Sequence, residues 1–347
     1  MWRPMNKDEL ISTDIAQAIE TLKAGGLVGL PTETVYGLAA DASNPDGVAR
    51  IFAFKERPSQ HPLILHVAND GMSWKRYGVV DHPVIDALAA AFWAGAMTLI
   101  LKKTDAVSSV VTGGKNTVGL RVPEHPVAEA VLRESGLALA APSANRFGQI
   151  SPTTAEHVWQ SFHDSTLLGT FPFLIVEGGA SSVGIESTIV DASNIDEQGI
   201  VILRLGQVTQ DAVEGVAKAY DVAVSVKHHY AEDDQNTIAA GSYARHYAPN
   251  TPSQLVHVGD FEELLWEKAS KSEKPLGILA FHEKPDSLEA PTHWVEASNT
   301  PSVYAQTLYA HLRDLDALGC SELLIEAPPE QAEWQAILDR LRRATHA

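Results

Sequence analysis

The chain has 347 residues, which suggests two domains at roughly 100–200 residues per domain, and its 45% hydrophobic and 20% charged residues exclude a mainly disordered chain. Its single cysteine, Cys320, excludes a disulfide framework and a zinc site built from thiolates. The net charge of −18 is spread along the chain, with 15 basic and 24 acidic residues in 1–215 and 8 basic and 16 acidic residues in 251–347. We therefore expect no strong direct binding to nucleic acid, which requires a field of basic charge.

No run of about 18 apolar residues occurs, so we expect no membrane-spanning helix. The opening residues, MWRPMNKDEL, lack the apolar core of a signal peptide, and we expect a cytoplasmic protein.

Residues 1–215 alternate helical and strand patterns. Helix-start signals at Ser12-Thr13-Asp14 and at Asn44-Pro45 precede residues with helical spacing, and Gly25-Gly26 ends the first of these helices. Further helices are predicted at 83–93, 127–134, 155–162 and 211–219, and strands at 27–30, 63–67, 98–101, 118–122, 137–141, 173–176, 188–190 and 200–203. The strands cluster towards the end of this domain, which favours a mixed sheet over a purely parallel one.

Residues 216–252 are expected to form a linker, because the polar run Lys227–Gln235 interrupts the pattern. A smaller α/β domain of the Rossmann type is predicted over 253–347, with strands at 255–258, 276–281 and 323–326 and helices at 261–269, 303–318 and 334–343.

Hydroxyl groups and cations follow several of the predicted strands. Pro31–Gly37, PTETVYG, comes directly after a buried strand, where open α/β sheets bind ligands, although it also fits a plain turn. Lys55 and Arg57, with Pro58 restricting the backbone, form a compact cationic loop suited to a triphosphate or, alternatively, a solvated helix end. His66 lies in an apolar strand and fits a hydrogen-bonded core histidine equally well.

The glycine pair at 112–117, TGGKNT, does not make a P-loop, because Ser109 occupies the position of the upstream glycine and no Ser or Thr follows Lys115. The segment from Ala141 to Thr153, APSANRFGQISPT, offers small residues, hydroxyls and a helix start, with simple helix capping as the alternative. Together with ESTIVD at 186–191 and RLG at 204–206, these pieces favour a nucleotide and a small polar substrate.

The order of the motifs PTETVYGL, KERPSQHPLILH, TVGLRVP, APSANRFGQISPT, ESTIVD and RLG resembles that of the YrdC-like L-threonylcarbamoyladenylate synthases, in their long two-domain form. The resemblance implies a twisted, open sheet in residues 1–215. It also implies a reaction in which L-threonine, bicarbonate (or CO₂) and ATP give L-threonylcarbamoyl-AMP and pyrophosphate, with Mg²⁺ as the cofactor. The product would serve tRNA threonylcarbamoyl-transfer machinery that modifies adenosine 37.

The resemblance also implies roles for individual residues. The threonine-binding residues would be Thr34, His66, Arg121, Ala141 and Ser187. The ATP-binding residues would be Arg57, His61, Thr117, Ser143, Ser151, Arg204, His246 and Tyr247, and the catalytic cations would be Lys55 and Arg57. The metal ligands stay unassigned.

Two departures from the family pattern stand out. His61 occupies a position where the family usually has asparagine, so a titratable ring replaces an amide. Ala94-Gly95-Ala96 replaces a Pro-Gly-Pro, which we expect to loosen the turn without removing a ligand.

The segment 236–249 is predicted to act as a lid that excludes water from labile intermediates, with a plain tether as the alternative. For the protein as a whole, two other functions stay open: an RNA-binding module, and a carbamoyltransferase-type domain like that of hydrogenase maturation proteins. The acidic charge of residues 1–215 argues against the first. The absence of cysteine-rich zinc segments argues against the second.

Overall fold

The computed structural model describes residues 6–227 and 246–346 and divides the chain into two compact units. Unit 1 comprises Met1–Phe147 and Ser151–Tyr243, and unit 2 comprises Gly148–Ile150 and Ala244–Ala347. The predicted fold class, a mixed-sheet α/β domain followed by a smaller α/β domain, is confirmed.

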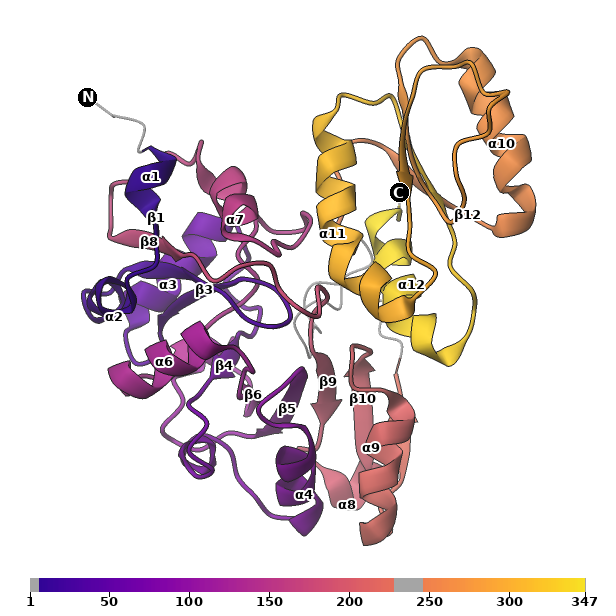
Figure 1. Ribbon diagram of the computed structural model, residues 1–347. Helices are drawn as coiled ribbons and strands as arrows, with labels where there is room; N and C mark the ends of the chain where they lie inside the picture. The colour runs from indigo at the N-terminus through magenta and orange to yellow at the C-terminus, as the bar shows by residue number, and fades with distance from the viewer. Residues whose placement is uncertain (1–5, 228–245, 347) are drawn as a thin grey trace. The chain divides into compact units, whose positions relative to one another are not determined.

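Unit 1 is built on a sheet whose eleven strands, within the described residues, follow the order β1-β8-β2-β3-β7-β4-β6-β5-β9-β10-β11 (Figure 1). The strands are β1 Ile11–Ser12, β2 Leu27–Leu30, β3 Gly37–Asp41, β4 Ile64–His66, β5 Met97–Lys102, β6 Thr117–Arg121, β7 Leu139–Ala140, β8 Phe173–Val176, β9 Thr188–Asp191, β10 Ile200–Arg204 and β11 Val224–Val226. Parallel pairs such as β4 with β6 alternate with antiparallel pairs such as β5 with β6, so the sheet is mixed, as the clustering of strands in the sequence predicted.

Two helices of unit 1 begin at the residues that the capping signals indicate. Asp14 accepts hydrogen bonds from the backbone of Ala16 and Gln17, and Asn44 caps a helix that has Pro45 in its first turn. The helices are α1 Lys7–Leu10, α2 Ile15–Lys23, α3 Pro45–Lys55, α4 Pro83–Phe92, α5 Ser109–Thr112, α6 Pro126–Ser135, α7 Ala155–Phe162, α8 Ile195–Gln198 and α9 Gln210–Ala217, with 3-10 turns η1 Ser73–Arg76 and η2 Lys218–Tyr220.

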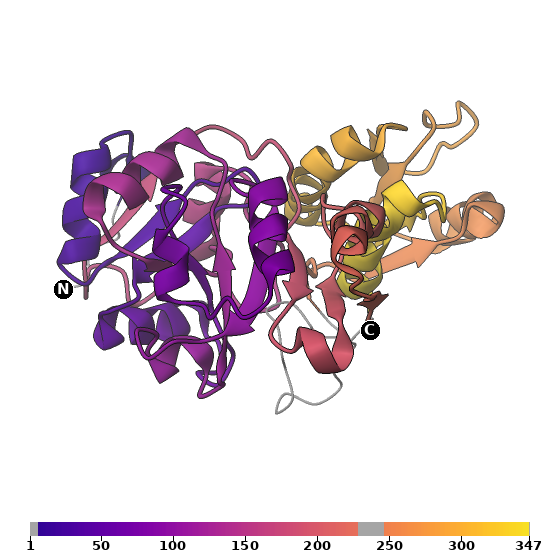
Figure 2. The same ribbon diagram turned by 90° about the horizontal axis from the view of Figure 1, so that it is seen from below.

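Helices cover both faces of this sheet (Figures 1 and 2). On one face α2 and α6 pack on alternate strand residues such as Val28 and Leu30, and on the other face Leu27 joins a larger core that includes Val48 and Ile51 of α3. With both faces buried, the strands consist almost entirely of small and apolar residues, and their loops carry the polar side chains.

Three strands of unit 1 were not predicted from the sequence, and the first of them, β1, has only two residues. β3 has the sequence GLAAD, which lacks the β-branched and aromatic residues that mark a strand, and only its pairing with β2 and β7 reveals it. β11 lies within the expected linker at 216–252, yet it pairs in parallel with β10. The first part of that linker therefore belongs to the sheet of unit 1. Residues 228–245, which hold most of the predicted lid, lie outside the described residues.

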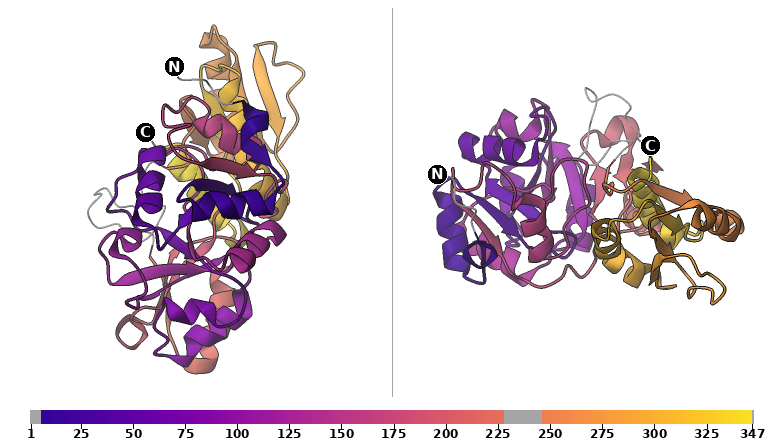
Figure 3. Two further views of the ribbon diagram at one scale, coloured as in Figure 1. Left: turned by 90° about the vertical axis from the view of Figure 1, so that its left-hand side faces the viewer. Right: turned by 90° about the horizontal axis from the view of Figure 1, so that it is seen from above.

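Unit 2 has a parallel four-stranded sheet of the order β12-β15-β13-β14. Its elements are β12 Ser253–Val256, α10 Val258–Lys271, β13 Leu276–Ala280, β14 Thr292–Glu296, α11 Pro301–Ala317, β15 Leu323–Glu326, η4 Ala332–Trp334 and α12 Gln335–Ala344. Phe261 and Leu265 of α10 pack on Ile278 and Leu324 of the sheet, and α10 lies on the side of the sheet opposite α11 (Figures 1 and 3). Strand β14 was not expected from the sequence, because Thr, His and Glu make most of its THWVE sequence polar.

The short segment Gly148–Ile150 folds with unit 2 although its neighbours in the sequence belong to unit 1. The amide of Ala248 donates to the Gly148 carbonyl over 3.0 Å, and the partly buried guanidinium of Arg313 donates to the Ile150 carbonyl. The same unit has a cavity of about 510 Å³ at the carboxyl ends of its strands, lined among others by His257, Phe281 and Glu326.

Prediction for the glycine pair. Gly113 and Gly114 have positive φ angles of 59° and 81°. A Cβ atom on Gly113 would lie 2.1 Å from the Gln60 carbonyl oxygen, whereas one on Gly114 would meet no atom within 4 Å. Gly114→Ala should therefore cost about 1–2 kcal/mol of stability for the left-handed backbone alone. Gly113→Ala should cost about 3 kcal/mol or more, because backbone must also move. Urea unfolding of both variants measures the difference, and equal losses would show that the turn does not pack on Gln60.

Candidate active site

Backbone hydrogen bonds join two of the predicted motifs of unit 1. The amide of Tyr36, in PTETVYG, donates to the Pro152 carbonyl over 2.9 Å, and the amide of Ala144 donates to the Tyr36 carbonyl over 2.8 Å. Leu38, at the start of β3, donates to the Pro142 carbonyl over 2.7 Å. The PTETVYG loop and the segment 141–153 thus form one surface, although about 100 residues separate them in the sequence.

Lys55 connects a third motif to this surface. It is buried at the end of α3, and its ammonium donates to the Ser143 carbonyl over 2.6 Å and to the Asn145 carbonyl. Its own carbonyl accepts from the Phe147 amide over 2.8 Å. Burial, together with the nearby charge of Arg57, lowers the pKa of Lys55 well below its usual value. In this structure Lys55 therefore holds the 143–147 loop, and its catalytic role stays a prediction.

Arg57 and His61 lie on the loop that follows α3, and both are buried. The Arg57 guanidinium donates to the Pro62 carbonyl over 3.2 Å and lies 5.8 Å from the centre of the Phe147 ring. The His61 ring is 5.5 Å from the same Phe147 ring. Two of the residues predicted for ATP thus share an aromatic neighbour on the loop that Lys55 holds.

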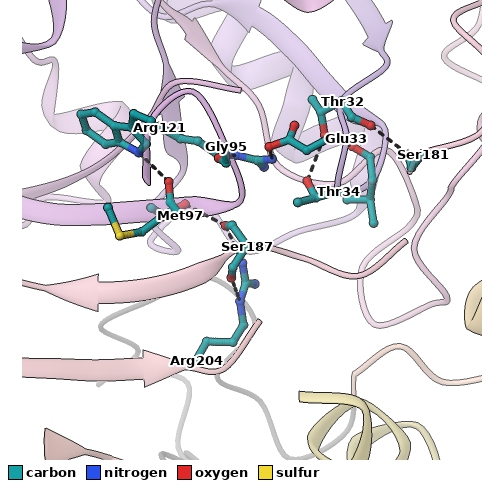
Figure 4. A network of polar contacts seen from close by, with 12 residues as sticks. Thr32, Glu33, Thr34, Gly95, Met97, Arg121, Ser181, Ser187 and Arg204 are labelled. Carbon is teal, nitrogen blue, oxygen red and sulfur yellow. Dashed lines mark hydrogen bonds and ion pairs between the residues drawn. The ribbon is translucent and has the colours of Figure 1, made fainter. Parts of the chain in front are cut away.

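Arg121 and His66 end two neighbouring parallel strands. They are register partners at the carboxyl ends of β6 and β4, and both side chains are buried. The Arg121 guanidinium lies 2.7 Å from the Glu33 carboxylate and also donates to the Gly95 carbonyl over 3.4 Å (Figure 4). Two of the residues predicted for threonine therefore lie together. The Glu33 carboxylate, which was not predicted, lies next to the Arg121 guanidinium.

Burial gives His66 an unusual pKa. It lowers the pKa of His66 to about 3, and the neighbouring positive charge of Arg121 acts in the same direction. Near neutral pH the His66 ring is therefore uncharged. Its Nδ1 atom is buried and has no hydrogen-bond partner among the described residues.

Ser187 and Arg204 meet at the other side of the site. The Arg204 guanidinium donates to the Ser187 carbonyl over 3.0 Å and to the Ser187 hydroxyl over 3.3 Å (Figure 4). The hydroxyl groups of Ser187 and Thr98 are 2.8 Å apart. Ser187 precedes β9, Arg204 ends β10 and Thr98 lies in β5, so three neighbouring strands supply this group.

Thr34 and Ser151 contribute two further buried hydroxyl groups. The Thr34 hydroxyl lies 3.0 Å from that of Thr32, in the same loop as Glu33. The Ser151 hydroxyl donates to the Glu186 carboxylate over 2.6 Å.

The remaining predicted residues are more scattered. Ala141 donates its amide to the Ile64 carbonyl over 3.0 Å, and Ser143 forms an isolated bridge with Gly37. Thr117 begins β6 whereas Arg121 ends it, so the strand separates them by about 13 Å.

His246 and Tyr247 belong to unit 2. The Tyr247 ring stacks on Tyr309 at 5.7 Å, and the His246 amide donates to the Arg343 carbonyl over 3.2 Å.

Several polar groups of the site were not predicted from the sequence: Glu33, Gly95, Thr98 and Glu186. Glu33 stands inside the PTETVYG motif that drew attention, and an acid in a run of small and apolar residues was the available signal. The Gly95 carbonyl has no sequence signal, because a backbone atom becomes a partner only through folding.

Among residues 6–227 and 246–346, no group of three or more His, Cys, Asp or Glu side chains is placed to hold a metal ion. In the same part of the chain, no helix has the length and hydropathy to span a membrane.

Buried cations and hydroxyls at the strand ends of an open mixed sheet define an α/β enzyme for small polar, anionic substrates. A family model described as "Telomere recombination" matches residues 20–206, and one described as "Threonylcarbamoyl-AMP synthase, C-terminal domain" matches residues 208–346. The chain belongs to the threonylcarbamoyl-AMP synthase family and is an enzyme of this type, as the motif resemblance predicted.

Individual relatives agree over almost the whole chain. The threonylcarbamoyl-AMP synthase of Bacillus subtilis (strain 168) is 36% identical over 345 residues, which cover 97% of this chain and 95% of the relative. That of Pyrococcus abyssi is 33% identical and covers 93% and 92%. The crystal structure of P. abyssi Sua5 complexed with L-threonine is similar with a TM-score of 0.83 and 31% identity, covering 99% of this chain and 96% of that one.

Prediction for His66. Because its pKa is lowered from 6.5 to about 3 on folding, the unfolded chain takes up a proton between these values that the folded chain does not. Stability should therefore fall as the pH is lowered from about 6.5, with up to a tenfold change in the unfolding equilibrium per pH unit. Urea unfolding at pH 7, 6 and 5 should show a shallower pH dependence in His66→Gln than in the wild type. His163→Gln, at an exposed histidine, is the matched control, and the same slope in all three proteins would contradict the assignment.

Proposed function

We propose that this chain carries out its family's reaction in the buried polar cluster of unit 1, converting L-threonine, bicarbonate and ATP into L-threonylcarbamoyl-AMP and pyrophosphate. The observation that carries the proposal is the meeting of Arg121, His66, Thr34, Ser187 and Arg204 at neighbouring strand ends of one sheet. The similarity to P. abyssi Sua5, solved with L-threonine, supports threonine as the amino acid.

For threonine, we assign the carboxylate to Arg121, because a planar guanidinium suits a carboxylate and a buried cation requires an anion. Thr34, Ser187 and the backbone of Ala141 are assigned to the remaining polar groups of the amino acid. His66 is neutral near pH 7 and adds an uncharged polar wall without competing with Arg121 for the carboxylate.

For ATP, we assign the phosphates to Arg57, Lys55 and Arg204, and we assign His61, Thr117, Ser143 and Ser151 to other contacts with the nucleotide. Of these, Arg57 and His61 lie beside Phe147, whose ring offers an apolar face. The assignment of His246 and Tyr247 to ATP rests on the sequence resemblance.

The reaction makes heavy electrostatic demands. The threonine nitrogen must attack the carbon of bicarbonate or CO₂, and a carbamate oxygen must then attack the α-phosphorus while pyrophosphate leaves. Both steps bring negative groups together, so fixed cations in a water-poor site lower the barrier. Arg57, whose buried guanidinium lies close to Lys55, supplies fixed positive charge of this kind.

We propose that Mg²⁺ arrives with ATP rather than residing on the protein. Mg²⁺ needs only one or two protein carboxylates when phosphates and water complete its shell. The lack of a three-residue acidic or histidine cluster among the described residues is compatible with this arrangement.

We further propose that the product passes to tRNA threonylcarbamoyl-transfer machinery for adenosine 37, and that the reaction is cytoplasmic. The acidic charge of the chain favours transfer through a partner over tight tRNA binding by this protein itself.

The direct test incubates the full chain with ATP, Mg²⁺, bicarbonate and labelled L-threonine. The expected result is threonine-dependent release of pyrophosphate together with a labelled threonylcarbamoyl adenylate. Pyrophosphate release that ignores threonine, or no labelled adenylate, would overturn the proposed function.

Prediction for Arg121. Arg121→Lys should raise the KM for threonine about tenfold or more, because one ammonium cannot reproduce the two parallel hydrogen bonds of a guanidinium. The KM for ATP should change little. Arg133→Lys, at an exposed arginine of α6, is the matched control and should behave as the wild type. Wild-type threonine kinetics in Arg121→Lys would show that Arg121 does not bind the carboxylate.

Prediction for Arg57. Arg57→Ala should impair ATP use by about 2–5 kcal/mol in kcat/KM for ATP, because a buried phosphate contact is lost. Arg133→Ala controls for the removal of an arginine as such. Steady-state kinetics with varied ATP provide the measurement, and an unchanged kcat/KM for ATP would contradict the assignment.

A further inference from the structure

Glu33 lies in the site, and its carboxylate oxygens have no hydrogen-bond partner among the described residues. Its side chain is about 5% exposed, and its Oε1 atom lies 2.7 Å from Nη2 of Arg121. Among residues 6–227 and 246–346, neither carboxylate oxygen of Glu33 nor this Nη2 atom makes a hydrogen bond, although the ion pair joins the two side chains (Figure 4). The charges of the two residues are paired, but these three atoms make no hydrogen bond within the described part of the chain.

Such an arrangement is unfavourable for stability. Buried ions lose their hydration, and a close pair offsets that loss only when good hydrogen bonds satisfy the remaining donors and acceptors. Most buried polar groups in proteins have a partner, and exceptions call for an explanation. The atoms of Glu33 and Arg121 that make no hydrogen bond are explained if a ligand supplies their partners.

The backbone holds Glu33 in place. The Glu33 carbonyl accepts from the Val183 amide over 2.7 Å, and the preceding Thr32 carbonyl accepts from the Ser181 hydroxyl over 2.9 Å. The Thr32 side chain also donates to the Val35 carbonyl over 2.6 Å. The carboxylate is thus directed at Arg121 by a rigid loop rather than by a mobile surface chain.

An amino acid near neutral pH carries a carboxylate and an ammonium on one carbon atom. The site presents the opposite charges side by side, a guanidinium and a carboxylate. Among the residues labelled in Figure 4, Glu33 is the only one with an anionic side chain, so it is the natural counter-ion for an ammonium.

We propose that Glu33 is a counter-ion that exchanges partners: it holds Arg121 when threonine is absent, and it binds the threonine ammonium once the threonine carboxylate has taken Arg121. This proposal rests on the assignment of the carboxylate to Arg121. The site thereby selects the zwitterion, because a ligand that has only the carboxylate leaves Glu33 buried and unpaired.

The exchange makes opposite predictions for two ligands. Glu33→Gln removes the charge but keeps the size, so it should weaken L-threonine binding about 10- to 100-fold. The analogue 2,3-dihydroxybutanoate has a hydroxyl in place of the ammonium and keeps the carboxylate. It should bind Glu33→Gln at least as well as the wild type, because Arg121 no longer has an internal carboxylate to release.

The experiment measures both ligands by calorimetry on the full chain, with L-threonine alone and with the analogue alone. Glu33→Asp keeps the charge and should recover part of the threonine affinity, which also guards against a folding defect in Glu33→Gln. Glu124→Gln, at an exposed carboxylate three residues after Arg121, is the matched control and should bind both ligands as the wild type does.

A purely structural role for Glu33 makes a different prediction: loss of Glu33 would misplace Arg121 and weaken both ligands alike. Equal weakening, unchanged threonine affinity, or failure of Glu33→Gln to bind the analogue would each overturn the proposal. The proposed function fails separately, if the wild-type protein makes no threonylcarbamoyl adenylate or if Arg121→Lys keeps normal threonine kinetics.

Discussion

The buried ammonium of Lys55 organises the loops on which the site depends. Its two hydrogen bonds go to backbone carbonyls of the 143–145 segment, and its own carbonyl accepts from Phe147. Burying a lysine is costly, and the cost is visible in its lowered pKa. The carbonyls compensate by supplying acceptors, and in return the lysine fixes a loop that no regular secondary structure holds. Through this loop, the KERP motif and the SAN motif become parts of one surface.

The polar side chains of this surface fall into two kinds, which differ in how fully the protein itself supplies their hydrogen bonds. Arg204 and Ser151 have hydrogen-bond partners inside the protein: Arg204 donates to the carbonyl and hydroxyl of Ser187, and Ser151 donates to the Glu186 carboxylate. Glu33 and Arg121 are close in space but poorly hydrogen-bonded. The internal partners of Arg204 and Ser151 fix the positions of these side chains, whereas Glu33 and Arg121 keep atoms that a ligand can still engage. A preorganised site of this type does not need to reorganise water or protein dipoles during the reaction.

The mixed sheet explains how so many polar groups meet. Parallel pairing of β4 with β6 brings His66 and Arg121 to the same register position. Parallel pairing of β5 with β9, and antiparallel pairing of β9 with β10, bring Thr98, Ser187 and Arg204 together. Because both faces of the sheet are covered by helices, polar side chains can collect only at the strand ends and in the adjoining loops.

Many of the helices and strands, and the family, could be predicted from the sequence. Strand Phe173–Val176 and helix Ala155–Phe162 have the bounds that their apolar patterns predict, and the motif order indicated the family. Local pattern suffices in such cases, because periodicity and capping depend on neighbours within a few residues. Strands β3 and β14 were not predicted, since their Gly, Ala and polar residues carry a weak strand signal, and β11 was not predicted because its three residues, VSV, are too short a run to mark a strand.

The sequence by itself determined which residues are available: the hydroxyls of PTETVYG, the cations of KERP, and Arg121 and Arg204 on their strands. Only the tertiary structure decided how they are used. It turned Lys55 towards backbone carbonyls, placed the Gly95 carbonyl and the Glu33 carboxylate at Arg121, and made His66 a neutral ring. The reason is physical: burial and contact between distant segments set the partners and pKa of a charged group, and neither quantity is a property of the local sequence.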